Sequence, residues 1–336
     1  MIKEKYLAKQ RDLENISVKP PFPRILKIDI CNTCNYCCVF CPQSKQAGKR
    51  GCIEKELCMT VIKDAYDGGA RELCLSSTGE PLLNPELEEY AAYAKSLGYT
   101  YLFFNTNGYY MDGKRARRLL ESGVDSIKFS INADLGSYQL VHGVDGYDRV
   151  IQNLKNLYGV RNAGKYGCQI YVSYIAVNQT KREADSLREK IANICDDFMV
   201  MNANNRAGSI HELDDKLLPE MDEYSYQYPC SQLFNNAYVT AEGYMVVCAQ
   251  DFENCTVVAD LHEENILSAW NNPMFTEFRT KYLKGDLTGM LCQNCIHNTS
   301  EPIKPVNEKM AGYAVSAEKE RFLTERIEEL VSRENM

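Results

Sequence analysis

The stretch DICNTCNYCCVFCPQS, residues 29–44, holds five cysteines between positions 31 and 41. Two iron–sulfur patterns overlap in it. Cys31, Cys34, Cys37 and Cys41, with a proline behind them, match the ferredoxin spacing C-x2-C-x2-C-x3-C-P. Cys34, Cys38 and Cys41 instead match C-x3-C-x2-C, which supplies three ligands and leaves the fourth iron open. The first pattern indicates an electron carrier, and the second a cluster that holds a substrate or cofactor on iron.

The composition is that of an ordinary soluble globular protein. The chain has 336 residues, of which 45% are hydrophobic and 25% charged. No apolar run approaches the roughly 18–20 residues that span a membrane, and the charged start MIKEKYLAKQRDLENISVKP lacks the apolar core of a signal peptide. The net charge is −8, and the basic run GKRARR at 113–118 is expected to be a solvated helix face. We therefore expect a cytoplasmic protein with no nucleic-acid and no membrane partner.

Fifteen cysteines are many for a chain in a reducing compartment, where such residues serve as metal ligands or catalytic groups more often than as disulfides. Five of them lie in the opening stretch. A second set lies in the last third of the chain, at Cys230, Cys248, Cys255, Cys292 and Cys295. The scattered remainder are expected to be small buried apolar residues.

Short apolar strands alternate with helical stretches between residues 24 and 201. Six such units predict a parallel sheet, and six are fewer than the eight of a closed barrel, so the fold class is α/β with a partial barrel. The expected strands are 25–30, 72–77, 100–105, 126–131, 168–176 and 197–202.

The organisation changes on either side of this pattern. We expect an N-terminal extension over 1–23, the barrel over 24–205, a linker with an acidic stretch over 206–229 and a small cysteine-rich domain over 230–300. Residues 301–336 form a tail whose charged, amphipathic pattern predicts a helix packed on its own protein.

Polar residues follow each expected strand, and in parallel β-α folds the ligand sits at these carboxyl ends. The cysteine loop follows the first strand, STGEP (77–81) the second and NTNG (105–108) the third. Ser130 and Asn132 end the fourth strand, Ser173 lies near the end of the fifth, and NANNR (202–206) follows the sixth. Each is an ordinary turn or cap when taken alone. Together, on one rim, they predict a site.

With these motifs in place, the chain resembles a radical S-adenosylmethionine (SAM) enzyme. The resemblance lies in CNYCCVFCP (34–42), STGEPLL (77–83), NTNGYYM (105–111) and SIKFSINA (126–133). It implies that Cys34, Cys38 and Cys41 bind a 4Fe-4S cluster whose open iron SAM chelates. Thr78, Gly79 and Glu80 would then meet the amino end of SAM, and Asn107, Ser130 and Asn132 its ribose and carboxylate. Thr78 stands where the family usually has glycine, and Asn132 where many members have aspartate.

The ferredoxin interpretation needs no barrel and leaves the rim residues without a role. Its two-cluster version also needs a second complete cysteine run, which the sequence lacks. Cys31 and Cys37 are therefore interpreted as neighbours or packing residues, and they remain alternative ligands.

The second cysteine set reads C-x12-G-x4-C from Cys230 to Cys248, followed by CQNC at 292–295. Four thiolates suit either zinc or an iron–sulfur cluster, and spacing alone does not separate the two. The alternation in AYVTAEGYMVVC predicts a hairpin that turns at Glu242-Gly243. A thioredoxin-like role for CQNC is a minor alternative.

The region from Cys230 to CQNC is similar to the auxiliary-cluster extension, of SPASM or twitch type, of radical SAM enzymes. That resemblance implies one auxiliary 4Fe-4S cluster on Cys230, Cys248, Cys292 and Cys295, with Cys255 as a spare. His297 is expected to be an exposed or capping residue.

The resemblance also implies a reaction. An external donor such as flavodoxin or ferredoxin supplies one electron, and SAM is cleaved to a 5'-deoxyadenosyl radical that takes a hydrogen atom from the substrate. The favoured hypothesis is an oxidoreductase that converts a sugar- or cyclitol-like alcohol to a ketone, with the auxiliary cluster as electron acceptor. Arg206, just past the sixth strand, would take the hydroxyl proton or orient the substrate. A peptide- or protein-modifying maturase and a non-catalytic electron carrier are the alternatives.

Overall fold

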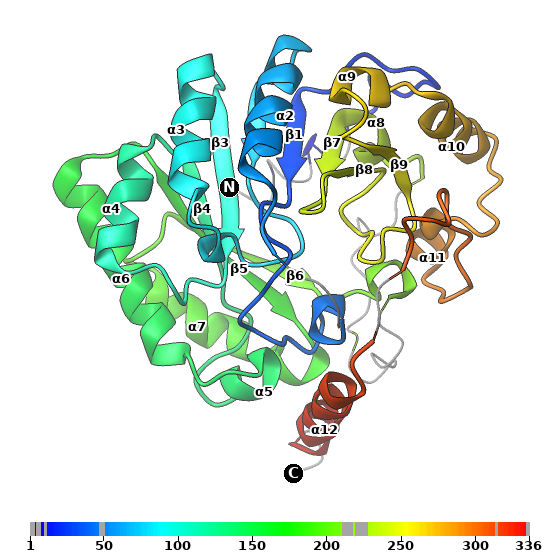
Figure 1. Cartoon of the computed structure of the whole chain (residues 1–336). Coiled ribbons are helices and arrows are strands. Elements are labelled where there is room, and N and C mark those ends of the chain that lie inside the picture. The colour runs from blue at the N-terminus through cyan, green and yellow to red at the C-terminus, as the bar shows by residue number, and fades with distance from the viewer. Residues whose placement is uncertain are drawn as a thin grey trace.

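The computed structural model describes residues 4, 8–9, 12–46, 51–209, 218, 228–312 and 315–333. One mixed sheet organises the described chain, with helices arrayed around its outside (Figure 1). Its nine strands run in the order β6-β5-β4-β3-β2-β1-β7-β8-β9.

The first six strands of the described chain are parallel to their neighbours and form the predicted partial barrel. The α/β fold class is thus confirmed, and the strands begin and end within three residues of the expected positions. They are β1 (Ile25–Ile28), β2 (Glu72–Cys74), β3 (Tyr101–Thr106), β4 (Ser126–Ser130), β5 (Gln169–Ala176) and β6 (Asp197–Asn202).

Helices connect these strands, and apolar side chains of the strands alternate toward them. Leu26 and Ile28 of β1 and Ile127 and Phe129 of β4 are fully buried in the main core, whereas Lys27, which alternates with the β1 pair, is half-buried on the opposite face. The helices are α2 (Lys55–Asp67), α3 (Leu87–Leu97), α4 (Gly113–Glu121), α5 (Tyr138–His142), α6 (Tyr147–Gly164) and α7 (Glu183–Ile191), with short 3-10 turns η1 (Pro42–Ser44), η2 (Pro81–Leu83), η3 (Asn178–Thr180) and η4 (Arg206–Gly208).

The cysteine-rich region extends the same sheet. Strand β7 (Asn236–Val239) pairs in parallel with β1, and β8 (Tyr244–Val246) and β9 (Val257–Asp260) follow in antiparallel order. The predicted hairpin turn is confirmed, because Thr240 and Tyr244 bond across it and Gly243 adopts φ +84°, a backbone conformation that favours glycine. The second cysteine region therefore lies directly against the first strand of the barrel.

Four short helices complete this region: α8 (Gln232–Asn235), α9 (Ile266–Ala269), α10 (Pro273–Leu283) and α11 (Leu291–His297). Trp270 and Phe275 are fully buried and meet edge-to-face, with ring centroids 5.1 Å apart. These residues extend the main hydrophobic core of the barrel into this region.

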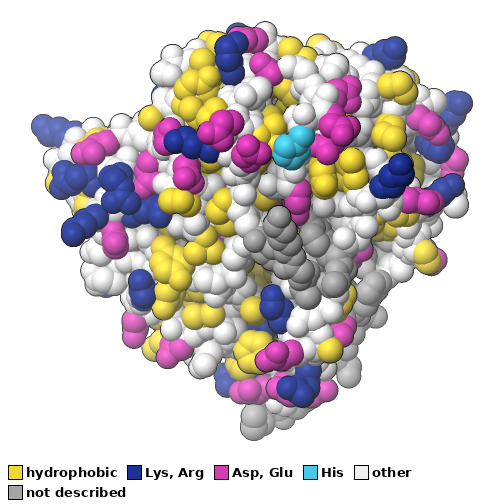
Figure 2. Space-filling model, in the orientation of Figure 1, with side chains coloured by type: hydrophobic (Ala, Val, Ile, Leu, Met, Phe, Trp, Pro, Cys, Tyr) yellow, Lys and Arg dark blue, Asp and Glu magenta, His cyan; other side chains and the backbone are white. Residues whose placement is uncertain are grey.

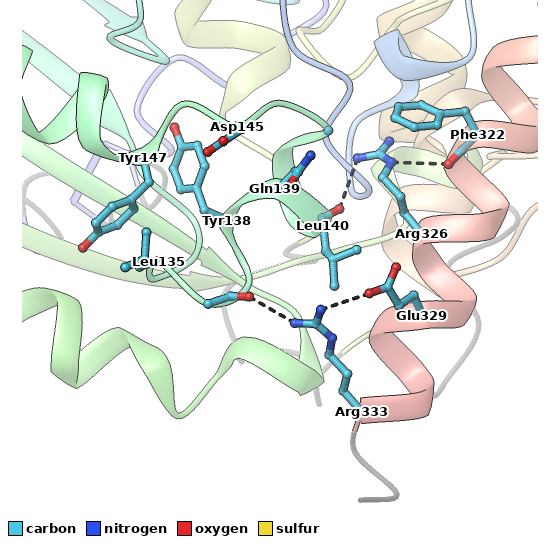
Figure 3. Close-up of a pocket in the computed structure, with 12 residues that line it drawn as sticks. Leu135, Tyr138, Gln139, Leu140, Asp145, Tyr147, Phe322, Arg326, Glu329 and Arg333 are labelled. Atoms are coloured by element: carbon cyan, nitrogen blue, oxygen red, sulfur yellow. Dashed lines mark hydrogen bonds and ion pairs between the residues drawn. The ribbon is translucent and has the colours of Figure 1, made fainter.

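The tail contains α12 (Ala317–Arg333), which packs against α5 (Figure 1). Arg326 donates to the carbonyl oxygens of Leu140 and Cys37, and Arg333 donates to that of Gly136. Figure 3 shows both arginines reaching from α12 toward the α5 segment, across a hollow of about 400 Å³. The tail helix is thus attached to the loop that carries the first cysteine set.

No helix in the described ranges is both long enough and apolar enough to cross a bilayer. Figure 2 shows Lys and Arg side chains gathered over α4, with acidic side chains beside them. Arg115 and Arg118 of α4 both pair with Glu88. The basic run GKRARR is therefore a solvated helix face with paired arginines.

Candidate functional site

The first cysteine set lies in the loop that follows β1 and ends at η1. Cys34, Cys38 and Cys41 are each half-buried. The backbone N–H of Cys41 donates to the carbonyl of Cys38 at 3.1 Å, and the N–H of Tyr36 donates to the sulfur of Cys34 at 3.4 Å. Loop hydrogen bonds thus fix the backbone between the three predicted ligands.

Their thiols lie close enough to influence one another. Burial raises the pKa of Cys34 and of Cys38, and the neighbouring sulfurs raise it further. Crowded thiols of this kind need a positive group before they can lose their protons, and a bound iron–sulfur cluster supplies one. The donor set therefore fits the cluster that its spacing predicts.

Cys31 is set apart from these three residues. It is buried, and its backbone pairs with that of Cys52 in an isolated antiparallel β-bridge. Cys37 lies closer to the three predicted ligands, since its sulfur raises the pKa of both Cys34 and Cys38. The structure thus groups Cys37 more closely with the predicted ligands than Cys31.

The turn after β2 packs directly on the cysteine loop. A Cβ on Gly79 would stand 2.0 Å from the carbonyl oxygen of Cys31 and 2.7 Å from that of Thr33, so only glycine fits. The backbone that approaches Gly79 is therefore the cysteine loop itself. Thr78 donates its hydroxyl to Asp29 and accepts a hydrogen bond from Gln43.

Glu80 is 2% exposed, and its carboxylate accepts three hydrogen bonds from the protein. They come from the Thr106 hydroxyl at 2.6 Å, the Asn107 N–H at 2.7 Å and the Leu82 N–H at 3.0 Å. Burial raises the pKa of Glu80 to about 7, although these hydrogen bonds act to lower it. The side chain therefore ties the β2 turn to the end of β3.

Asn107 connects that strand end to the cysteine loop. Its amide nitrogen donates to the Asn35 side chain at 2.9 Å and lies 3.9 Å from the Cys34 sulfur. Ser130 is half-buried at the end of β4. Asn132 is buried just beyond it, and its amide oxygen accepts the Ile175 N–H at 2.8 Å. All predicted SAM contacts thus share the rim with the first cysteine set.

A histidine from α5 completes this rim. His142 is 1% exposed, its Nδ1 lies 3.2 Å from the Cys38 sulfur, and its Nε2 accepts the Asn132 N–H at 3.1 Å. Burial, with a contribution from Arg326, holds the pKa of His142 near 3, so the imidazole is neutral. His142 was missed at the sequence level because no local motif marks it.

The second cysteine set converges between β8, α11 and the start of α8. Burial raises the pKa of Cys292, and Cys248, Cys230 and Cys295 raise it further, which shows that the four thiols are neighbours. Cys292 and Cys295 lie on the first turns of α11, and the Gln250 N–H donates to the Cys248 sulfur at 3.4 Å. Four half-buried thiols are a donor set that fits a cluster with no open iron.

Cys255 and His297 lie outside this group. Cys255 is buried, and its pKa is raised by burial and by Asp251 and Glu253 rather than by the other cysteines. His297 is exposed at the end of α11. Within the described ranges no three His, Cys, Asp or Glu side chains meet closely enough for a single metal ion. The ligands of a cubane cluster stand farther apart than those of one ion.

Arg206 opens η4, which packs on α11, the helix of the CQNC motif. Asn205 donates to the Thr299 carbonyl at 3.0 Å across this contact. Arg206 therefore lies between the barrel rim and the second cysteine set.

Lys27 and Lys128 were not predicted as site residues. A lysine inside an otherwise apolar strand, as in ILKIDI and SIKFSI, could have indicated both positions.

Comparison with known families identifies the two parts of the chain. The model described as "Radical SAM superfamily" matches residues 28–188. The SPASM model, "Iron-sulfur cluster-binding domain", matches residues 230–296. The chain belongs to the radical SAM superfamily and carries a C-terminal SPASM domain. These domains imply a SAM-binding 4Fe-4S cluster and an auxiliary cluster, so the predicted cofactors are confirmed, and iron–sulfur rather than zinc is indicated for the second site.

Relatives of this enzyme differ in their reactions. The S-adenosyl-L-methionine-dependent 2-deoxy-scyllo-inosamine dehydrogenase of Niallia circulans is 25% identical over 81% of this chain and 92% of its own. The probable GTP 3',8-cyclase of Saccharolobus solfataricus is 26% identical over 68% of this chain and 75% of its own. The structure of Streptococcus suis SuiB bound to precursor peptide SuiA shares the fold, with 15% identity, a TM-score of 0.63 and coverage of 83% of this chain and 69% of that one.

Proposed function

We propose that this enzyme oxidises a hydroxyl-bearing carbon of a small sugar- or cyclitol-like substrate, with the auxiliary cluster as the electron acceptor. The observation that carries the proposal is the set of four half-buried, neighbouring cysteines beside the barrel sheet. Because all four thiols belong to the protein, the set has no free position for a substrate and suits electron transfer. The similarity to a cyclitol-type dehydrogenase over 92% of its length supports the same reaction class.

The reaction balances as a two-electron oxidation. When bound, the first cluster and SAM supply a 5'-deoxyadenosyl radical at the cost of one electron from an external donor such as flavodoxin or ferredoxin. The substrate would lose a hydrogen atom from carbon, a proton from its hydroxyl and one further electron, for which the auxiliary cluster would supply the acceptor. The product is a ketone, and methionine and 5'-deoxyadenosine are released. We also propose a cytoplasmic location, because both cluster sites need reduced thiols.

The residues of this chain have positioning roles in the proposal. Cys34, Cys38 and Cys41 would hold the first cluster, and Cys230, Cys248, Cys292 and Cys295 would hold the second. Gly79, Glu80 and Asn107 shape the SAM pocket by fixing the cysteine loop against β2 and β3. An arginine stays charged at any ordinary pH and cannot accept a proton, so Arg206 orients the substrate.

Transfer of a labelled hydrogen tests the reaction class. The reconstituted enzyme is incubated with SAM, a reductant and candidate alcohols that carry deuterium on the hydroxyl-bearing carbon. Mass spectrometry should find deuterium in 5'-deoxyadenosine and a ketone in an equal amount. Deuterium transfer with no ketone would contradict the oxidation and favour a redox-neutral reaction. A failure to cleave SAM would contradict radical chemistry altogether and leave the electron carrier.

A further inference from the structure

Three cationic side chains gather on the inner wall of the barrel, and none belongs to the SAM site described above. Lys27 lies on β1, Lys128 on β4, and Arg206 follows β6. Each is half-buried. Lys128 stands between two fully buried residues, Ile127 and Phe129, that face the helices, so its own side chain faces the interior.

The cations are near one another. Burial lowers the pKa of Lys128 to about 8, and the positive charges of Lys27 and Arg206 lower it further, while Cys74 opposes them. Lys27 reaches toward the second cysteine set, since Cys248 and Cys230 both act on its pKa. The group therefore lies on the way from the barrel interior to the auxiliary site.

No carboxylate of the described residues forms an ion pair with Lys27, Lys128 or Arg206. Lys128 and the Arg206 side chain form no hydrogen bond or ion pair with any described residue. Among the described residues the hydrogen bonds of Lys27 go to neutral groups, with its Nζ 3.4 Å from the Gln232 amide oxygen and 3.5 Å from the Tyr238 hydroxyl.

Two carboxylates near this wall have other partners, and Glu72 also lies at the opposite end of its strand from the cysteine loops. Glu72, at the start of β2, pairs with Lys9 and Arg24. Asp29 accepts the hydroxyl and the N–H of Thr78. A half-buried cation without a counter-ion is costly, so an anion is the ligand that this wall suits.

We propose that Lys128, with Lys27 and Arg206, binds an anionic oxygen group of the substrate, a phosphate or a carboxylate, inside the barrel. The inference rests on the proposed function and narrows its substrate class to acidic or phosphorylated alcohols. An aminocyclitol, whose ammonium group is positive, is disfavoured at this wall. Asn105, the register partner of Lys128 on β3, adds a neutral donor beside the anion.

Anion binding to the reconstituted enzyme without SAM tests this directly. Calorimetric titrations use sulfate and inorganic phosphate as tetrahedral probes and acetate as the carboxylate probe, all at constant ionic strength. Saturable binding of the tetrahedral probes alone identifies a phosphate subsite, and of acetate alone a carboxylate subsite. Binding of neither kind overturns the proposal and leaves the cations as counter-charges for the clusters.

Variants assign the binding to this wall. Lys128→Met should weaken anion binding about ten-fold or more, because a charged hydrogen bond is lost. Lys128→Arg should retain it, and Lys155→Met, which removes an exposed lysine of α6, should leave it unchanged. Unaltered binding in folded Lys128→Met overturns the assignment.

A stability measurement separates a binding role from a structural one. A lysine kept for an absent anion destabilises the ligand-free protein, so Lys128→Met should raise its unfolding temperature and abolish the rise that the anion causes in the wild type. A lower unfolding temperature together with unchanged anion binding would show a structural lysine. Because SAM is absent from these measurements, failure of the oxidation assay leaves the anion result standing.

Discussion

The Nδ1 of His142 lies 3.2 Å from the sulfur of Cys38, while the backbone N–H of Asn132 donates to the Nε2 of the same ring. A neutral imidazole has one N–H, and the nitrogen that accepts a hydrogen bond is the one without it. The proton of His142 is therefore on Nδ1, directed at the sulfur. This contact connects the end of β4 with the loop of the first cluster.

The contact predicts a change in reduction potential. An N–H directed at a cysteine sulfur stabilises the reduced, more negative cluster, so His142→Leu should lower the potential of the SAM-binding cluster and slow SAM cleavage with a fixed donor. A redox titration followed by electron paramagnetic resonance measures the shift. His142→Gln keeps an N–H donor and serves as the matched control. Equal potentials in the wild type and a folded His142→Leu variant would rule out this role.

A second prediction separates the two overlapping cysteine patterns. Cys38→Ala should abolish SAM cleavage, because the set of three loses a ligand. Cys31→Ala should leave cleavage largely intact, since the Cys31 backbone pairs with that of Cys52 and its thiol donates to the Thr33 carbonyl. Cys37→Ala should behave like Cys31→Ala. Production of 5'-deoxyadenosine is measured after anaerobic reconstitution. Cleavage that survives in Cys38→Ala and is lost in Cys37→Ala would restore the ferredoxin spacing.

Most of the fold could be predicted from the sequence because the strands are short, apolar and regularly separated by amphipathic helices. The hairpin at Gly243 was predictable for the same local reason. That β7 would pair with β1 was not, since a strand pairing between residues 25 and 236 leaves no trace in local periodicity.

The site was predictable only where a motif marked it. Gly79 was expected to admit SAM, yet the atoms that exclude a side chain there belong to Cys31 and Thr33, more than 40 positions away in sequence. His142 and Arg326 reach the cysteine loop from elements distant in sequence, α5 and α12. Such contacts depend on tertiary packing, which a single sequence does not contain.

The proposed anion site predicts a pH dependence. Lys128 loses its proton as the pH rises through about 8, because burial lowers its pKa, with Lys27 and Arg206 adding to the effect and Cys74 opposing it. Sulfate keeps its charge between pH 7 and 9, so its affinity for the wild type should fall over that interval. Lys128→Arg, whose guanidinium stays charged, should lose most of this dependence. The same fall in Lys128→Arg would assign the titration to another group.

Metal content gives a further prediction. Anaerobically reconstituted protein should hold about eight irons per chain, four for each of two cubane clusters. Iron and sulfide analysis measures this, with Cys255→Ala as the control that should change neither. Iron for a single cluster with one equivalent of zinc would show that the second site is structural and would remove the proposed electron acceptor.

The role of the second site is tested by removing two of its ligands. In the Cys292→Ala/Cys295→Ala variant, SAM cleavage and deuterium transfer into 5'-deoxyadenosine should persist, because the first cluster is intact. The ketone should disappear, because the substrate radical has no electron acceptor. Liquid chromatography with mass spectrometry follows both products. Cys255→Ala again serves as the control, since this buried cysteine lies outside the set of four.

Loss of the ligands also endangers the fold, since metal binding and folding are coupled where thiols hold a small domain together. Strands β7–β9 continue the barrel sheet through β1, so unfolding of this region would disturb the first site as well. Circular dichroism and the spectrum of the first cluster must therefore match those of the wild type before the products are compared. A folded double variant that makes ketone at the wild-type rate would show that the second cluster carries no obligatory electron, and an exogenous acceptor would take its place.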